Sequence, residues 1–489
     1  MIYDKLIYEL SKPGRIGYSL PKTNYPEFSL EDLGKNLRKL DLVLPEVSEL
    51  DCVRHYTNIS KKNFGIENGF YPLGSCTMKY NPKINEEIAK TYSFTKLHPN
   101  QPVRTVQGAL RVYYELQVAL SNISGLSEFS LNPYAGAHGE LVGLMIMKEY
   151  HRSRNDFKRN KIIIPDSAHG TNPASTVVCG MEVVEIKSND QGVVDVDVLK
   201  SVLSDEIAGM MLTNPNTLGI FEKDICEITK LIHDAGGLMY YDGANLNAML
   251  GQVRPGDMGF DVMHINLHKT FSTPHGGGGP GSGPVGVKDF LVDFLPNPKI
   301  KKIEDYYYIA EEADSIGQIS SYFGNFLVEL KAYAYILTLG KENLMQVGGL
   351  ATLNANYIRN ALKETYYLPI DGYCMHEVVF DGLKDNPNEI RTLDVAKRLL
   401  DYGMHAPTIY FPLLFHQAIM IEPTETESLQ TIDDFIEVMK KIADEAKNTP
   451  ELLNNAPIST PVSRLDEIFA AKKMIFSYRD YIEYMNSKE

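Results

Sequence analysis

The stretch LMYYDGANLNAMLGQVRPGDMGFDVMHINLHKT, residues 238–270, contains two short apolar runs, and each of them ends in polar residues. The first run leads into Asp242, and the second leads into the segment NLHKT at residues 266–270. Short apolar runs bounded by polar residues are typical of buried strands. Lys269 follows Asp242 by 27 residues, which leaves room for one loop and one strand between them. The stretch therefore predicts two strands of one sheet that carry Asp242 and Lys269 at their carboxyl ends.

The chain before this stretch alternates between strand-like and helix-like patterns. Such alternation indicates βαβ units and a mostly parallel sheet flanked by helices, so an α/β fold is predicted. Ligands of these sheets bind beyond the carboxyl ends of the strands. The expected strands are 161–169, 181–188 and 207–216, and the expected helices are 141–153, 194–203 and 221–237.

The pattern along the chain predicts three segments. Residues 1–93 show little periodic order and are expected to form an extended N-terminal arm with a short helix near residues 30–40. Residues 94–342 are expected to form the large domain around the sheet, beginning with a helix near residues 103–122. Residues 343–489 combine helix and strand patterns and are expected to form a small α+β domain.

Composition narrows the class of protein. The 489 residues include 48 Lys and Arg against 63 Asp and Glu, a formal net charge of −15, which argues against a general nucleic-acid binder. The five cysteines are widely spaced without a CxxC pair, so neither a disulfide framework nor a Cys-rich zinc module is expected. The charged N-terminus lacks a signal-peptide pattern, and no apolar run approaches the ~20 residues of a membrane helix. These features favour a soluble, cytoplasmic, globular protein.

A glycine-rich stretch, HGGGGPGSGPVGV, follows at residues 275–287. A flexible linker is one interpretation of such a composition. Its place directly after a strand, and its two prolines, favour a fixed turn instead.

Lys269 and Asp242 together indicate a specific chemistry. Desolvation lowers the pKa of a lysine, and a neutral amine is the form that makes a Schiff base. A carboxylate at the mouth of the sheet needs a cationic partner. Pyridoxal phosphate (PLP) requires such a pair, with a lysine on its aldehyde and a carboxylate on its ring nitrogen. Taken singly, Lys269 also fits an ordinary surface lysine, and Asp242 also fits a turn former or helix cap.

Two further segments fit the same interpretation. The segment AGAHGE at residues 135–140 opens a helix, and its free N–H groups could hold a phosphate. His169 ends the strand-like segment at residues 161–169, where an imidazole could lie flat on a ring. An ordinary strand-to-helix turn and a structural histidine are the alternatives. The order of phosphate loop, stacking histidine, aspartate and lysine is nevertheless the layout of fold-type I PLP-dependent transferases.

Several longer motifs resemble one family over essentially the whole chain. The segment YPLGSCTMKYNP at residues 71–82 resembles the PLGSCTMK signature of the glycine cleavage system P-protein family. The length matches the PLP-carrying C-terminal half of that protein, which forms the separate second subunit of split P-proteins. The other similar segments are KPGRIGYSLP (12–21), DSAHGTNPAS (166–175), LTNPNTLGIFE (212–222), NLHKTFSTPHGGGGPGSGP (266–284), EPTETES (422–428) and TPVSRLDE (460–467).

The resemblance implies a reaction and partners. Glycine would lose its carboxyl group as CO2, and the aminomethyl group would pass to the lipoyl arm of H-protein. The lipoyl disulfide would be the oxidant, so no nicotinamide is needed, and no metal is expected. The chain would pair with the first subunit of the split P-protein, and two such pairs would form a heterotetramer.

The resemblance also implies roles for individual residues. Lys269 would carry PLP covalently, Asp242 would hold its ring nitrogen and His169 would stack on its ring, and these three are the expected catalytic residues. Cys76 has no base beside it in the sequence and is interpreted as a small buried residue. The remaining cofactor-binding residues would be Gly136, Ala137, His138, Asn214, Ala244, His268, Thr270 and His275, and the substrate-binding residues would be Ser75, Thr77 and Lys79.

Two other functions stay open at this point. One is a stand-alone PLP-dependent decarboxylase that acts on a larger amino acid, which SAHGTN and NLHK also resemble. The other is a scaffold or regulatory protein without catalysis, against which the intact pair of Lys269 and Asp242 argues.

Overall fold

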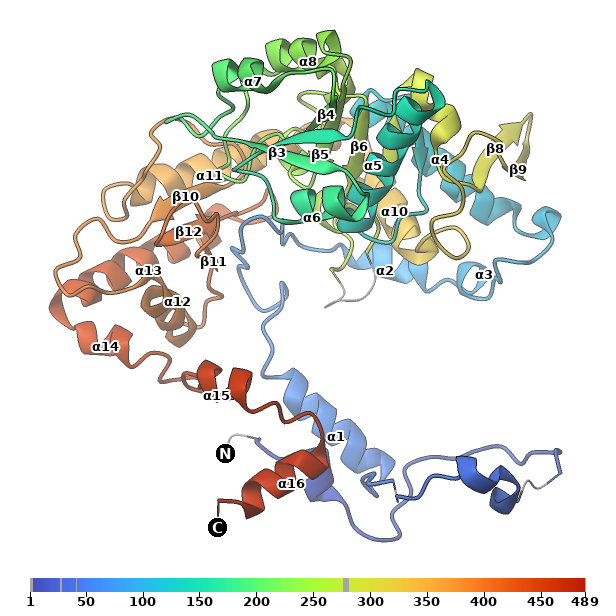
Figure 1. Ribbon diagram of the computed structural model, residues 1–489. Coiled ribbons are helices and arrows are strands. Elements are labelled where there is room, and N and C mark those ends of the chain that lie inside the picture. Colours follow the sequence, from blue (N-terminus) through green and yellow to red (C-terminus); the bar gives the residue numbers. More distant parts are fainter. Residues whose placement is uncertain (1–2, 27–28, 41, 276–280, 489) are drawn as a thin grey trace. The chain divides into compact units, whose positions relative to one another are not determined.

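The computed structural model describes residues 3–26, 29–40, 42–275 and 281–488 (Figure 1). The chain divides into two compact units, Met1–Asn68 with Ala456–Glu489, and Gly69–Asn455. This division differs from the three predicted segments, because residues 69–93 belong to the larger unit and residues 456–489 to the smaller one. The three-part division therefore stays a prediction.

A seven-stranded sheet forms the centre of the larger unit, in the order β1-β7-β6-β5-β4-β2-β3. The pairs β2/β3, β2/β4, β4/β5 and β5/β6 are parallel, whereas β7 runs antiparallel to both β1 and β6. The predicted mostly parallel sheet is confirmed. The strands are β1 Glu128–Ser130, β2 Lys161–Pro165, β3 Glu182–Ile186, β4 Ile207–Thr213, β5 Leu238–Gly243, β6 Val262–Ile265 and β7 Val285–Val287.

Successive residues of the central strands enter two hydrophobic cores. Tyr240 packs in a cluster with α5, whereas its neighbour Tyr241 packs in a cluster with α4 and α8. Because side chains alternate across a strand, the two clusters lie on opposite faces of the sheet. Helices therefore cover both faces, as predicted (Figure 1). The helices of this part are α2 Lys83–Ala89, α3 Tyr92–Thr95, α4 Gln107–Ser124, α5 Gly136–Ser153, α6 Thr171–Val178, α7 Val196–Val202, α8 Ile225–Asp234, α9 Leu267–Thr270 and α10 Phe326–Leu344.

A second, three-stranded antiparallel sheet, in the order β10-β12-β11, lies in the C-terminal part of the larger unit. Its residues join α11, α12 and α13 in one hydrophobic cluster. Strands β8 Lys299–Ile303 and β9 Tyr306–Ala310 pair separately. The other elements are α11 Val347–Leu362, β10 Val378–Asp381, α12 Thr392–Asp401, β11 Thr408–Ile409, β12 Ala418–Ile421, α13 Leu429–Asn448 and α14 Pro450–Asn454.

The smaller unit contains α1 Glu49–Ser60, α15 Glu467–Lys472 and α16 Tyr478–Asn486. The expected helix near residues 30–40 is a 3-10 helix at Leu30–Asn36. Helix α1 is missing from the sequence prediction, because it has little apolar periodicity. Its start is fixed instead by a capping box, in which Ser48 accepts from the N–H of Asp51 and the Asp51 side chain accepts from the N–H of Ser48. Among the described residues, no helix is long and apolar enough to span a lipid bilayer.

Candidate active site

Lys269 lies in the short helix α9, directly beyond the end of β6. Asp242 lies near the end of the neighbouring strand β5, where its register partner on β6 is His264. The positive charge of Lys269 acts on Asp242 and helps to lower the pKa of its carboxyl. The two residues predicted from strand ends therefore lie close enough in space to interact.

Three groups fasten the carboxylate of Asp242, which is 1% exposed. The side chain of Asn172 donates to Oδ2 over 3.0 Å, and the N–H of Ala244 donates to Oδ1 over 3.0 Å. The Nε2 atom of His264 lies 3.4 Å from Oδ1. Burial alone would raise the pKa of Asp242, but His264, these hydrogen bonds and Lys269 together lower it. The carboxylate is therefore held ionised and fixed, as a partner for a protonated ring nitrogen must be.

Asn172 and His264 were missed by the sequence prediction. Asn172 lies inside the motif DSAHGTNPAS, which drew attention to His169 instead. His264 is a single polar residue within the apolar strand VMHI, and this isolation is a signal that could have singled it out. Its Nδ1 atom lies 2.7 Å from the hydroxyl of Tyr240, so both ring nitrogens have polar neighbours.

Helix α5 begins at Gly136, as the predicted phosphate loop requires. A Cβ atom at Gly136 would lie 2.6 Å from the side-chain nitrogen of Asn266, so only glycine fits there without displacing Asn266. Ala137 is exposed, and His138 is half-buried with Nδ1 accepting from the N–H of Tyr134 over 3.2 Å. The first amide groups of a helix have no acceptor within it, so this end can bind an anion.

Polar atoms without a hydrogen-bond partner among the described residues gather in the chain around Lys269. They include His268 Nδ1, Thr270 Oγ1 and His275 Nε2, and the rings of the two histidines lie 5.2 Å apart. Burial, with the charge of Lys269 contributing, lowers the pKa of His268 to about 3 and that of His275 to about 4. Both imidazoles are therefore neutral at physiological pH. Buried polar atoms are normally satisfied, so unpartnered ones at strand ends indicate a place for a polar ligand.

Asn214 and His169 differ in how far they match their predicted roles. The side chain of Asn214 is fully buried, with Oδ1 accepting from the N–H of Glu222 and Nδ2 without a partner among the described residues. His169 is exposed, its Nδ1 lies 2.9 Å from the hydroxyl of Thr171, and its ring centroid lies 5.9 Å from that of Phe411. Stacking of His169 on a cofactor ring therefore stays a prediction. The glycine-rich turn at residues 276–280 lies outside the described residues.

The first part of the signature loop at residues 75–79 is held by two glutamates. The N–H of Ser75 donates to Glu377 over 2.7 Å. The N–H and the hydroxyl of Thr77 donate to the two oxygens of Glu422 over 2.8 and 2.6 Å. Ser75 and Thr77 have positive φ angles of 65° and 49°, an unusual backbone for non-glycine residues. These bonds hold the loop in that conformation.

Lys79 is bonded within the protein, and its predicted contact with the substrate stays a prediction. Its side chain is 1% exposed, and its ammonium donates to Glu425 and Asn247, each over 2.8 Å, and to the hydroxyl of Tyr335 over 3.1 Å. All three ammonium hydrogens are thus committed to the protein, and none remains for a substrate carboxylate. The sequence could not reveal this, because Glu425 lies 346 residues further along the chain. The polar side-chain atoms of Thr77 and Lys79 are bonded within the protein. The side-chain hydroxyl of Ser75 has no hydrogen-bond partner among the described residues.

Cys76 is half-buried between these residues. Burial raises the pKa of its thiol, and the charges of Glu422 and Glu377 raise it further, while Lys269 opposes them. A protonated thiol is a poor nucleophile. The structure thus agrees with the interpretation of Cys76 as an unreactive residue.

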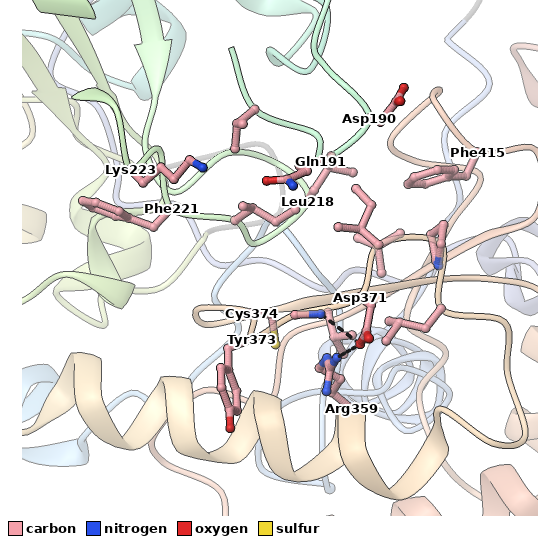
Figure 2. A pocket seen from close by; sticks show the side chains of 18 residues that line it. Asp190, Gln191, Leu218, Phe221, Lys223, Arg359, Asp371, Tyr373, Cys374 and Phe415 are labelled. Atoms are coloured by element: carbon pink, nitrogen blue, oxygen red, sulfur yellow. Dashed lines mark hydrogen bonds and ion pairs between the residues drawn. The ribbon is translucent and has the colours of Figure 1, made fainter. Parts of the chain in front are cut away.

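A separate cavity of about 370 Å³ lies against β10 (Figure 2). Figure 2 shows Asp371 and Arg359 pointing toward one another, and their ion pair measures 2.6 Å. None of the predicted site residues lines this cavity. It is therefore distinct from the site around Lys269.

Comparison with known proteins gives matches in two separate parts of the chain. A family model described as the glycine cleavage system P-protein matches residues 27–301, and a model described as the C-terminal domain of glycine dehydrogenase matches residues 347–457. A protein of Caldanaerobacter subterraneus, named probable glycine dehydrogenase (decarboxylating) subunit 2, is 60% identical over 97% of this chain and 99% of its own length. A protein of the same name from Thermotoga maritima is 54% identical over 97% of this chain and 99% of its own length.

The fold has counterparts among solved structures. An inhibitor-bound glycine decarboxylase (P-protein) of the glycine cleavage system superposes with a TM-score of 0.71 at 19% identity, over 86% of this chain and 100% of that one. A glutamate decarboxylase of Lactobacillus brevis superposes with a TM-score of 0.66 at 12% identity, over 86% and 98%. The predicted fold-type I architecture is confirmed. Together with the sequence matches, these findings show that the chain belongs to the glycine cleavage system P-protein family.

Proposed function

We propose that this chain is the PLP-carrying subunit 2 of glycine dehydrogenase (decarboxylating). In this role it removes the carboxyl group of glycine and passes the aminomethyl group to the lipoyl arm of H-protein. The observation that carries the proposal is the 60% identity to a protein named for this activity over nearly the whole chain. The fixed pair of Asp242 and Lys269 at adjacent strand ends supports it. A stand-alone decarboxylase of a larger amino acid is not favoured, because similarity to such enzymes is confined to the fold.

The residues present fit PLP. A buried, ionised Asp242 suits a protonated ring nitrogen, and the free amides of helix α5 suit a phosphate. The unpartnered Thr270 Oγ1 and His268 Nδ1 are further groups that a phosphorylated ligand can satisfy. Asn214 Nδ2 is a buried donor without a partner and suits an anionic ring oxygen. Lys269 supplies the amine for covalent attachment.

Bound PLP would supply an aldehyde that takes up an amine and a ring that withdraws electrons from the substrate carbon. The chain's own residues prepare this chemistry. Asp242 would hold a proton on the ring nitrogen of the cofactor, and Asn172 and His264 hold the carboxylate of Asp242 in place. The neutral His268 and His275 leave the site without extra positive charge, and each can accept a hydrogen bond. Ser75 lies in the signature loop, which Glu377 and Glu422 hold. Its hydroxyl is proposed to bind the substrate carboxylate.

The chain is proposed to act in an assembly. Its partners are glycine dehydrogenase subunit 1, in a heterotetramer of two copies of each subunit, and lipoylated H-protein. The name "subunit 2" of the relatives supports the first partner. The enzyme is proposed to be cytoplasmic.

Two measurements test the proposal. The purified chain should show a visible absorbance band that borohydride abolishes, and mass spectrometry should then locate the cofactor on Lys269. The Lys269→Ala variant should lack the band. With subunit 1 and lipoylated H-protein added, the chain should exchange labelled bicarbonate into glycine. Turnover of another amino acid without H-protein, together with no exchange of glycine, would contradict the proposal.

A further inference from the structure

Glu377 and Glu422 lie side by side in the second sheet, at the start of β10 and the end of β12. In the antiparallel pair of β10 and β12, Val378 is the register partner of Ile421. Glu377 directly precedes Val378 and Glu422 directly follows Ile421, so the two glutamates occupy the next position of the same register. Both side chains are 0% exposed. The fold therefore forces two carboxyl groups together without water.

A histidine lies against this pair, and the described residues offer it no hydrogen-bond partner. The Nε2 atom of His376 is 3.7 Å from Oε1 of Glu377 and 4.0 Å from Oε1 of Glu422. His376 is also 0% exposed, and neither of its ring nitrogens makes a hydrogen bond within the described chain. Burial lowers its pKa to about 3, with the charge of Lys269 adding to the effect. A neutral imidazole cannot balance the charge of the two carboxyl groups.

The hydrogen bonds to the pair leave its charge uncompensated. Glu377 accepts one bond from Ser75, Glu422 accepts two from Thr77, and Oε1 of Glu377 has no hydrogen-bond partner among the described residues. All three donors are neutral. Among the described residues, no lysine or arginine forms an ion pair with either glutamate. Oxygen atoms of the two carboxyl groups lie within 4.8 Å of one another. Two buried carboxylates so close together cannot both stay ionised, as in the aspartic-protease dyad.

The charged groups around the pair point to one bound proton. Burial raises the pKa of Glu422 to about 7, and Glu425 adds to this, while Thr77 and Lys269 oppose it. Burial raises the pKa of Glu377 well above its usual value, and the neighbouring Glu422 adds to this, while Ser75 and Lys269 oppose it. The thiols of Cys76 and Cys374 also face the pair, and both are protonated at neutral pH because burial raises their pKa.

We infer that Glu377 and Glu422 share one proton at neutral pH, so that the pair carries a single negative charge and holds the signature loop through Ser75 and Thr77. The strand register places the two carboxyl groups together away from water, and the shared proton removes the cost of a second buried negative charge.

A bound divalent metal is the competing explanation. One histidine and two glutamates within reach of one another form a donor set suited to a transition metal. The positive charge of Lys269 acts on all three residues and disfavours a second cation among them. The observations therefore favour a proton over a metal.

An infrared experiment observes the proton directly on the chain without cofactor. Infrared difference spectra of the wild type minus the E377Q/E422Q double variant should show one carboxylic-acid C=O band at pH 7. That band should disappear as the pH rises. In the single variants E377Q and E422Q, the remaining carboxyl group should titrate at a lower pH, because its like-charged neighbour is gone. The single variants keep the side-chain shape and a carbonyl acceptor for the loop, so they serve if the double variant does not fold. No acid band at pH 7, or one metal ion per chain that is lost in E422Q, would overturn the inference.

Discussion

Thr77 binds Glu422 twice, with its N–H donating to one carboxylate oxygen over 2.8 Å and its hydroxyl donating to the other over 2.6 Å. Both residues are buried, and 345 positions of sequence separate them. These two hydrogen bonds connect the signature loop to the end of β12. It gives the loop a measurable part in stability.

Replacing Thr77 by valine removes the hydroxyl and keeps the shape. One oxygen of Glu422 then loses its donor, and hydrogen bonds to charged groups contribute about 1.5–3 kcal/mol. We expect Thr77→Val to lower the free energy of unfolding by about 2 kcal/mol in urea titrations. Thr77→Ser keeps the hydroxyl and should lose less. An equal loss in the two variants would attribute the effect to the methyl group instead.

Replacing Lys79 by methionine separates a structural role from substrate binding. The ammonium of Lys79 and the carboxylate of Glu425 form a buried ion pair of 2.8 Å. Removing one partner of such a pair costs about 3–5 kcal/mol, because a buried charge is left alone. Chemical denaturation should show this loss for Lys79→Met and a partial recovery for the double variant with Glu425→Gln. If Lys79→Met instead raises KM for glycine and leaves stability unchanged, the substrate-binding role predicted from sequence is correct.

Asn172 should control how tightly the cofactor binds. Its amide donates to the Asp242 carboxylate, and this bond helps to lower the pKa of Asp242. We expect Asn172→Ala to raise the Kd of PLP by about tenfold in absorbance titrations, the equivalent of ~1.4 kcal/mol. Asn172→Asp should weaken binding further, because a like charge favours protonation of Asp242. Tighter binding in the aspartate variant than in the alanine variant would contradict this role.

Stability should fall with rising pH through the titration of Glu422. The pKa of Glu422 is raised from 4.5 to about 7 in the folded chain, so the folded state binds the proton more tightly than the unfolded state. This contribution is fully present below pH 4.5 and is lost as the pH rises through about 7. Between pH 5 and pH 8, the wild type should therefore lose ~2.5 kcal/mol relative to Glu422→Gln. Unfolding titrations at both pH values measure the difference.

The control for this titration is Glu364→Gln. The side chain of Glu364 is 77% exposed and pairs with Lys384 at the surface. This variant should show no comparable change relative to the wild type between the two pH values. A parallel pH dependence of wild type and Glu422→Gln would show that Glu422 does not titrate in this range.

The strands that carry Asp242 and Lys269 could be predicted because their patterns are local. An apolar run ending in a polar residue is visible within ten positions, and the mostly parallel pairing of the strands follows from their alternation with helices. The same rule applied to AIMIEP would have singled out Glu422, which follows β12, whereas Glu377 precedes the apolar run VVF at the start of β10. Their pairing, however, depends on the register between strands distant in sequence.

Other parts of the site could not be predicted from the sequence. Whether Lys79 meets solvent, substrate or a carboxylate depends on Glu425, and no local pattern records that contact. Helix α1 escaped prediction because its caps, not an apolar face, define its start. The environment of Lys79 therefore depends on tertiary contacts, which local sequence patterns do not record.

The span between the signature loop and its glutamates has a consequence for synthesis. Ser75 precedes Glu377 by 302 residues, and Lys79 precedes Glu425 by 346. At a ribosome adding about 5–20 residues per second, the loop emerges about 15–70 s before the carboxylates that hold it. During that interval Lys79 has no buried partner and the left-handed residues Ser75 and Thr77 have nothing to fix them. The loop that borders Lys269 is therefore expected to be among the last parts of the nascent chain to reach its final form.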